Sequence, residues 1–128
     1  MAHWKAMEWQ TAVDAASGIR VYRLTGVLTD SRDAYTLIEQ VRAEVRSDPH
    51  PVLLNLAEVE QLTSAGVGMV ATLYTSAQNA KSVFALCGPT VRTRHLLEIV
   101  HLLQFIPVFD NEAEALVAFA RRGWEPVK

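Results

Sequence analysis

The sequence predicts an α/β domain: a mostly parallel, mixed β-sheet of about five strands with about four helices packed on it. Two observations carry this prediction. Short runs of β-branched and aliphatic residues alternate along the chain with longer segments whose apolar residues recur every three or four positions. In addition, the 128 residues suit a single domain, and their composition, half hydrophobic and a fifth charged, is that of an ordinary globular protein.

The first half of the chain is expected to form a hairpin, a helix and a buried strand. Ser17-Gly18 is a turn sequence between two short strands. Thr29 and Asp30 can cap a helix that carries one apolar stripe. The apolar run after that helix, interrupted by Asn55, is typical of a central strand buried on both faces. The predicted elements are strands at 9–15 and 19–24, a helix from Asp30 to about 46, and a strand at 52–56.

In the second half, helices and strands alternate regularly. Pro89 suits the first turn of a helix. Pro107 lies within an apolar run and implies an edge position or a break in the strand pairing, because proline has no amide hydrogen to donate. Asp110 is expected to cap the last helix and Gly123 to close it. The predicted elements are a helix at 64–80, a strand at 82–87, a helix from 88 to about 102, a strand at 105–109 and a helix at 112–122.

The composition argues against several classes of function. The formal charge is −2, so no basic excess points to nucleic acid or to a membrane surface. Cys87 stands alone, which excludes an internal disulfide and a cysteine metal cluster, and the four histidines show no ligand spacing. Residues 61–80 carry no formal charge, but their hydroxyl and amide groups favour a soluble helix over a membrane span. With no signal-peptide core, we expect a cytoplasmic protein without metal or cofactor.

The segment most informative for function is 62–68, which reads Leu-Thr-Ser-Ala-Gly-Val-Gly. It places a hydroxyl beside two glycines at a helix start, where free amides and the helix dipole favour an anion. Ser64 reads most simply as the N-cap, and Thr63 could serve equally well. A serine nucleophile is the alternative, but the elbow motif lacks its first glycine, and no triad with His95 or His101 can be recognised. The glycines continue into neither a dinucleotide fingerprint nor a phosphate-binding loop.

The helix predicted at 64–80 has an uncharged outer face. Its inward stripe is expected to consist of Val67, Val70, Ala71, Tyr74 and Ala77. The opposite face consists of Gly68, Thr72, Thr75 or Ser76, and Asn79. Such a flat, neutral face suits docking against another protein, since charged residues are depleted at the cores of interfaces. The alternative is that another part of the chain, such as the segment with Trp4 and Trp9, covers this face.

Together these segments resemble the STAS domain, and within it the bacterial anti-sigma factor antagonists, from about Trp9 to Phe119. The matching segments are Val52-Leu53-Leu54-Asn55-Leu56 at a strand end, the signature loop Thr63-Ser64-Ala65-Gly66-Val67-Gly68, Pro89-Thr90-Val91-Arg92 at a helix start, and Ile106-Pro107-Val108-Phe109-Asp110-Asn111-Glu112. The resemblance implies a single STAS-like domain over 1–128, with a core at about 9–119, a short N-terminal extension and a C-terminal tail.

The resemblance also implies a switch rather than an enzyme. In this family an ATPase-fold anti-sigma serine kinase phosphorylates the serine at the position of Ser64, and the unphosphorylated antagonist binds that kinase and frees a sigma factor. Thr63 stands where the family has an acidic residue, and Asp30 is displaced by one position from the family's second acid. The expected partner-binding residues are Asp30, Thr63, Ala65, Gly66, Gly68, Thr72 and Asn79.

Other partners and another function remain open on the same resemblance. A phosphatase and a second copy of the chain are further candidate partners. The alternative function is that of a non-switching STAS module, which serves as a scaffold, associates with a transporter or binds a small ligand, and is not phosphorylated.

Overall fold

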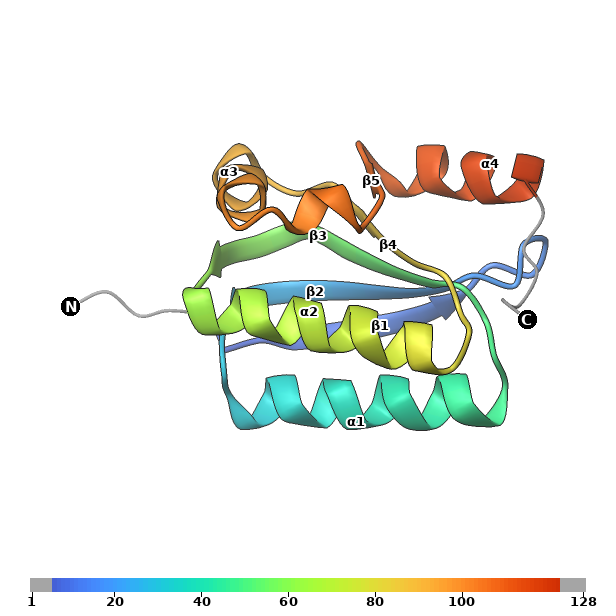
Figure 1. Ribbon diagram of the computed structural model, residues 1–128, viewed down its shortest axis with the longest axis horizontal. Coiled ribbons are helices and arrows are strands. Elements are labelled where there is room, and N and C mark those ends of the chain that lie inside the picture. Colours follow the sequence, from blue (N-terminus) through green and yellow to red (C-terminus); the bar gives the residue numbers. More distant parts are fainter. Residues whose placement is uncertain (1–5, 123–128) are drawn as a thin grey trace.

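A five-stranded mixed sheet with helices on both faces forms the fold (Figure 1). It is seen in a computed structural model that describes residues 6–122. Its elements are β1 (Glu8–Val13), β2 (Arg20–Leu28), α1 (Arg32–Ser47), β3 (Val52–Leu62), α2 (Ser64–Asn79), β4 (Phe84–Cys87), α3 (Val91–Ile99), the 3-10 turn η1 (Leu102–Gln104), β5 (Val108–Phe109) and α4 (Glu112–Arg122). The strands lie in chain order, with β1 antiparallel to β2 and every later pair parallel. The predicted fold class is confirmed, and β5 is an edge strand, one of the two possibilities that Pro107 implied.

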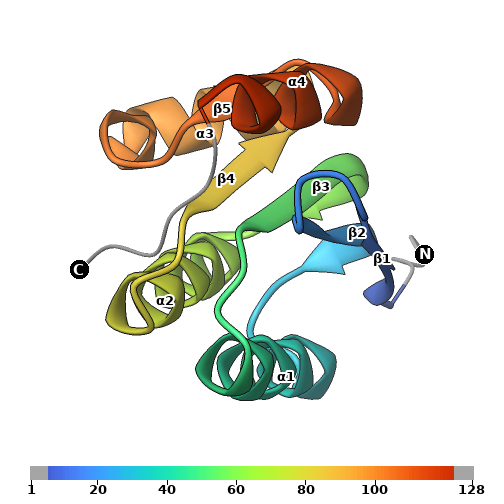
Figure 2. The same cartoon turned by 90° about the vertical axis from the view of Figure 1, so that its right-hand side faces the viewer.

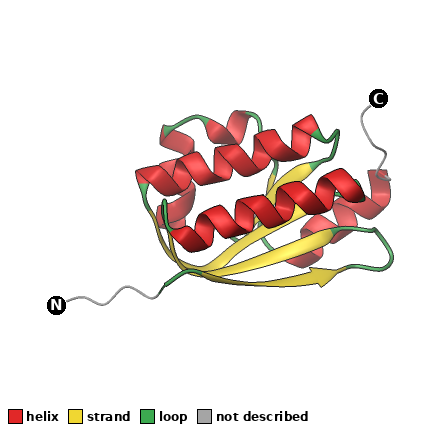
Figure 3. Cartoon of the chain, turned by 90° about the horizontal axis from the view of Figure 1, so that it is seen from below, coloured by secondary structure: helices red, strands yellow, loops and turns green. Residues whose placement is uncertain are grey.

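The sheet is covered on both faces. α1, α2 and α3 pack against one face, with α1 and α2 side by side, and α4 covers the other face (Figure 2 and Figure 3). Successive residues of β3 face opposite sides: Leu54 packs in the main apolar cluster with α1 and α2, and Leu53 packs in a second cluster with Ala115 of α4. Both leucines are fully buried. β3 is therefore the central strand, buried on both faces, that its apolar run predicted.

The last helix begins at Glu112 as predicted, but α1 and α3 begin later than predicted and all three helices use N-caps other than the expected ones. The N-caps are Ser31 in α1, Thr90 in α3 and Asn111 in α4, each with a side-chain oxygen that accepts from the amide three residues on. Thr29, Asp30 and Asp110, the predicted caps, therefore lie in the preceding loops, and Pro89 precedes its helix. All of these side chains can cap, so the choice depends on where the preceding strand ends.

The strand and helix lengths also differ from the predicted ones. β2 and β3 extend to Leu28 and Leu62, beyond the predicted ends at 24 and 56, because the two strands continue to pair in parallel. α3 stops at Ile99, since His101 takes the left-handed conformation with φ +63° and η1 follows. β1, β4 and β5 are shorter than predicted. Gly123, the predicted closing residue of α4, lies outside the described residues.

Among residues 6–122, none of the helices has the length and apolar character that a bilayer crossing requires. Within the same range, no group of three or more histidine, cysteine, aspartate or glutamate side chains is placed to hold a metal ion.

Candidate functional site

The candidate site lies where the carboxyl ends of β2 and β3 meet the N-terminus of α2 (Figure 1). The two strands end in register, with Leu28 opposite Leu62. The next residue, Thr63, donates its backbone N–H to the Leu28 carbonyl at 3.1 Å, and its hydroxyl lies 2.8 Å from that of Thr29. These contacts bring together the two loops that the sequence analysis singled out, although most of 56–64 is strand rather than loop.

Thr63, not Ser64, is the N-cap of α2. Its hydroxyl oxygen accepts from the Gly66 N–H at 3.0 Å, and its φ of −86° and ψ of 169° are extended, as an N-cap requires. Of the two caps that the sequence allowed, the structure therefore selects Thr63, and Ser64 becomes the first residue of the helix. The Ser64 side chain is exposed, whereas Thr63 is half-buried.

The two glycines of the signature loop have different roles. A Cβ on Gly66 would lie 2.0 Å from the Leu28 carbonyl oxygen and 2.8 Å from Leu62 Cδ1, so only glycine lets α2 approach the end of β2 this closely. A Cβ on Gly68 would meet nothing within 4 Å, because this residue faces open space. Gly66 therefore positions the site, and Gly68 keeps the outer face of α2 flat.

The buried and exposed faces of α2 correct part of the prediction. The buried residues are Gly66, Met69, Val70, Leu73, Ser76 and Ala77. Of the predicted inward stripe, only Val70 and Ala77 are fully buried, and Val67, Ala71 and Tyr74 are half-buried. The exposed residues are Ser64, Ala65, Gly68, Thr75, Gln78 and Asn79. The helix carries no charged residue, so the prediction of a neutral outer face is confirmed.

Trp9 does not cover this outer face, because it lies on β1 and packs against the main apolar cluster. Trp4, the other residue named in the covering alternative, lies outside the described residues. The two histidines considered for a triad are also separate from Ser64. His95 is exposed on α3 and His101 follows that helix, and within residues 6–122 no hydrogen bond joins either histidine to Ser64.

A hollow of about 530 Å³ lies between the N-terminal half of α2 and α1, and we call it the Asp30 hollow. Its lining residues are Asp30, Tyr35, Ile38, Glu39, Arg42, Ala65, Gly68, Met69 and Thr72. The structure thus brings together Asp30, Ala65, Gly68 and Thr72 of the predicted partner-binding set. Thr63 and Gly66 do not line the hollow; they hold the start of α2 against the end of β2.

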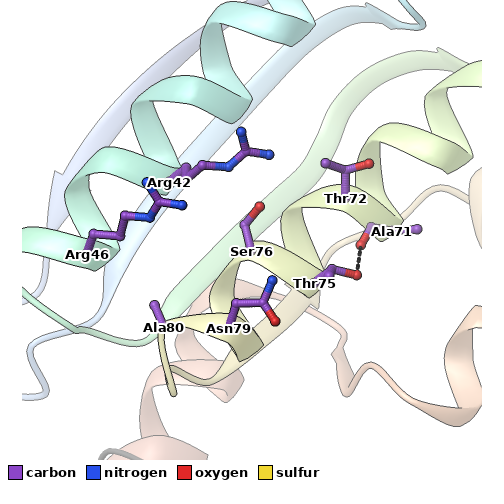
Figure 4. A pocket seen from close by; sticks show the side chains of 8 residues that line it. All are labelled: Arg42, Arg46, Ala71, Thr72, Thr75, Ser76, Asn79 and Ala80. Carbon is purple, nitrogen blue, oxygen red and sulfur yellow. Dashed lines mark hydrogen bonds between the residues drawn. The ribbon is translucent and has the colours of Figure 1, made fainter.

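Asn79, the remaining predicted residue, lies further along the helices in a second groove of about 450 Å³, which we call the Arg46 groove (Figure 4). Arg42 and Thr72 line both spaces, so the two are continuous. The contribution of α1 to these two spaces was not predicted from the sequence. The sequence does carry a sign of this contribution: the spacing of Tyr35, Glu39, Arg42 and Arg46 places four long side chains on one face of α1.

A separate polar cluster lies at the other face of the sheet and was also missed. Arg23 donates to both carboxylate oxygens of Glu112, at 2.6 and 3.0 Å, and the Asn55 amide donates to the same carboxylate at 2.7 Å. The hydrogen bonds from Arg23 lower the pKa of Glu112 below its usual range. Burial raises the pKa of the nearby Cys87 thiol to about 12. These side chains link β2, β3 and α4 rather than forming part of the α2 surface.

Comparison with known proteins identifies one family for this chain. The model of the STAS domain family matches residues 10–115. An anti-sigma F factor antagonist of Paenibacillus polymyxa is 24% identical over 110 residues, covering 86% of this chain and 94% of that protein.

Solved structures share the fold at lower identity. The anti-sigma factor antagonist SpoIIAA in its unphosphorylated form is 20% identical, with a TM-score of 0.65 over 92% of this chain and 99% of that one. SpoIIAA of Bacillus has also been solved in the phosphorylated form. A sulfate transporter family protein from Wolinella succinogenes has a TM-score of 0.67 at 16% identity, over 87% of this chain and 89% of that one.

Proposed function

Because this chain belongs to the STAS domain family, we propose that it is an anti-sigma factor antagonist whose binding is controlled by phosphorylation of Ser64. One observation carries the proposal: Ser64 is an exposed first residue of α2, beside an uncharged outer face that borders the Asp30 hollow. The function is one of binding rather than catalysis. Its setting is the cytoplasm, where sigma factors act.

The local geometry favours Ser64 over Thr63 as the phosphate acceptor. The Thr63 hydroxyl is half-buried and already contacts Thr29 and the Gly66 amide. Phosphorylation there would break the cap, whereas the Ser64 side chain is exposed. Thr63 also explains how the site tolerates the loss of the family's acidic residue, because threonine and aspartate both serve as N-caps. The cap is kept and only the negative charge is lost.

A phosphate on Ser64 would be tolerated in the free protein. Thr63 caps the helix by accepting from the amides of Gly66 and Val67, at 3.0 and 2.9 Å. The amides of Ser64 and Ala65 have no partner within the helix and are available to an anion. The phosphate adds about −1.5 to −2 charges at the positive end of the helix dipole, where negative charge is favoured.

The same phosphate would oppose docking. A partner that covers the neutral face of α2 would have to bury this charge without a counter-charge from α2, which is costly. Moving a complex from mostly bound to mostly free needs roughly 5 kcal/mol of differential affinity, a reasonable contribution from a dianion in an interface. The proposed docking surface consists of Asp30, Ala65, Gly68 and Thr72, which line one hollow.

The proposed partner is an ATPase-fold anti-sigma factor with serine kinase activity, and a phosphatase would reverse the modification. The test is to incubate the chain with this kinase and ATP and to map the phosphate by peptide mass spectrometry. Wild type should carry one phosphate on Ser64, and Ser64→Ala should carry none. Ser64→Ala should bind the anti-sigma factor as wild type does, and Ser64→Asp should bind more weakly while keeping its thermal stability.

Phosphate on Thr63, or no phosphate from a kinase that modifies a control substrate, would contradict the assignment. Equal affinities of Ser64→Ala and Ser64→Asp would place Ser64 outside the interface. If the anti-sigma factor binds but no phosphate is transferred, the non-switching STAS module becomes the better interpretation.

A further inference from the structure

The Arg46 groove combines two arginines with the polar side of α2. Arg42 and Arg46 come from successive turns of α1, and the α2 wall consists of Ala71, Thr72, Thr75, Ser76, Asn79 and Ala80. Figure 4 shows both arginine side chains extending from α1 into the gap in front of Ser76. No acidic residue lines this groove. It is therefore a local positive site in a chain whose formal charge is −2.

The positive charge is only partly neutralised within the described chain. Arg42 contacts Glu39 at 3.1 Å, but Glu39 is 71% exposed and lines the Asp30 hollow rather than this groove. Within residues 6–122, no carboxylate lies within 4 Å of the Arg46 guanidinium. An exposed pair such as that of Arg42 is weak, so both guanidinium groups are available to another anion.

Ser76 adds a hydroxyl group to the polar wall of the groove. It is 8% exposed and faces the groove, yet its hydroxyl takes part in none of the side-chain hydrogen bonds of the described residues. In contrast, the Thr72 and Thr75 hydroxyls each donate to a carbonyl of their own helix, at 2.9 Å. The Ser76 hydroxyl thus has no partner in the described part of the chain that competes with a ligand, and it lies beside the same space as the two arginines.

We propose that an acidic segment of the protein partner lies in the Arg46 groove, with its carboxylates on Arg42 and Arg46 and with Ser76 and Asn79 as further donors. The inference rests on the proposed function, because the groove continues from the Asp30 hollow through Arg42 and Thr72. A polar, open groove also suits an extended chain better than a small molecule, whose sites are mostly apolar and enclose most of the ligand.

The helix geometry defines the segment further. Arg42 and Arg46 are one turn apart, about 6 Å along α1. In an extended chain, side chains at positions i and i+2 share a face and are about 6.6 Å apart, so two acidic residues at that spacing match the two arginines. From Ser64 to Ser76 the helix rises about 18 Å, which five or six extended residues span. The segment is thus short and carries alternate acids.

The experiment measures the affinity of the cognate anti-sigma factor by titration calorimetry for wild type, Arg42→Glu/Arg46→Glu and Arg42→Lys/Arg46→Lys. Arg92→Glu is the matched control, because Arg92 is exposed on α3 and lines neither the Arg46 groove nor the Asp30 hollow. We expect the double glutamate variant to lose at least thirtyfold in affinity, the lysine variant less than about fivefold, and the control less than twofold. The wild-type affinity should also fall more steeply with salt than that of the glutamate variant.

Ser64→Asp, measured in the same series, separates this inference from the proposed function. If Ser64→Asp weakens binding and the double glutamate variant does not, the groove inference is overturned and the proposed function stands. If only the double glutamate variant weakens binding, the phosphate switch fails and the groove stands. If wild type does not bind the anti-sigma factor, both fail. The unfolding temperature of each variant confirms that a lost affinity does not reflect a lost fold.

Discussion

Replacing Gly66 with alanine should shift α2 away from the end of β2. The added Cβ would lie 2.0 Å from the Leu28 carbonyl oxygen and 2.8 Å from its carbon, whereas real Cβ atoms essentially never approach other atoms closer than 3.0 Å. The obstacle is backbone, so no change of rotamer can relieve it. The helix start must therefore move by about 1 Å, and the contacts of Thr63 with the same carbonyl and with Thr29 lengthen with it.

The magnitude follows from three contributions. Overpacking of this kind costs about 1–3 kcal/mol. Weakening the two Thr63 hydrogen bonds costs about 0.5–1.5 kcal/mol each. Alanine is favoured over glycine within a helix by about 1 kcal/mol, which offsets part of the loss. We expect Gly66→Ala to lower the free energy of unfolding by about 3 kcal/mol, which corresponds to a fall in Tm of roughly 9–15 °C for a domain of this size.

Gly68→Ala is the matched control, because it makes the same change two residues further along α2 with no atom within 4 Å of the new Cβ. It should raise the free energy of unfolding by about 0.5–1 kcal/mol. Urea unfolding followed by circular dichroism measures both variants. An unchanged or increased stability of Gly66→Ala would refute the close approach of α2 to β2. A destabilised Gly68→Ala would mean that the outer face of α2 is packed rather than open.

Three further predictions concern the cap, the polar cluster and the docking surface. Thr63→Ala should lower the free energy of unfolding by about 1 kcal/mol through the lost cap, and Thr63→Ser should restore most of it in urea unfolding. Glu112→Gln should destabilise the protein near neutral pH. Because the folded-state pKa of Glu112 is lowered, its stabilisation is present above the unfolded-state value and is lost as the pH falls through the folded value, so the difference from wild type should vanish in acid. A difference that persists in acid would contradict this. Thr72→Glu should change stability by less than about 0.5 kcal/mol yet weaken anti-sigma factor binding by tenfold or more in calorimetry. A large fall in Tm would show instead that Thr72 is part of the core.

Local patterns were sufficient to predict the order of the elements and the burial of β3. The run around Leu53 and Leu54 is short and apolar at successive positions, which is typical of a strand covered on both faces. Residues 57–62, in contrast, are half polar, with Glu60 and Gln61 adjacent, and their strand character depends on pairing with β2. That pairing is a long-range interaction that no local window contains.

The candidate site was also predicted only where its residues are neighbours in the sequence. The hydroxyls and glycines of 63–68 were recognisable, because they are adjacent in sequence. The role of Gly66 depends on Leu28, which is remote in the chain and close only after β2 and β3 pair. Likewise, the Arg46 groove needs side chains from both α1 and α2. Residues that act across two elements become visible only when the packing of those elements is known.

The strand order has a consequence for synthesis on the ribosome. Each strand pairs with the one that precedes it in the chain, so every new strand emerges after its partner has been made. A nascent chain that ends after α2 already holds β1 to β3 with α1 and α2, but its β3 edge at Val52–Asn55 still lacks β4. Such an open, apolar edge is prone to pair with other chains. The short interval before Phe84–Cys87 emerges is therefore the period in which nascent chains are most exposed to aggregation.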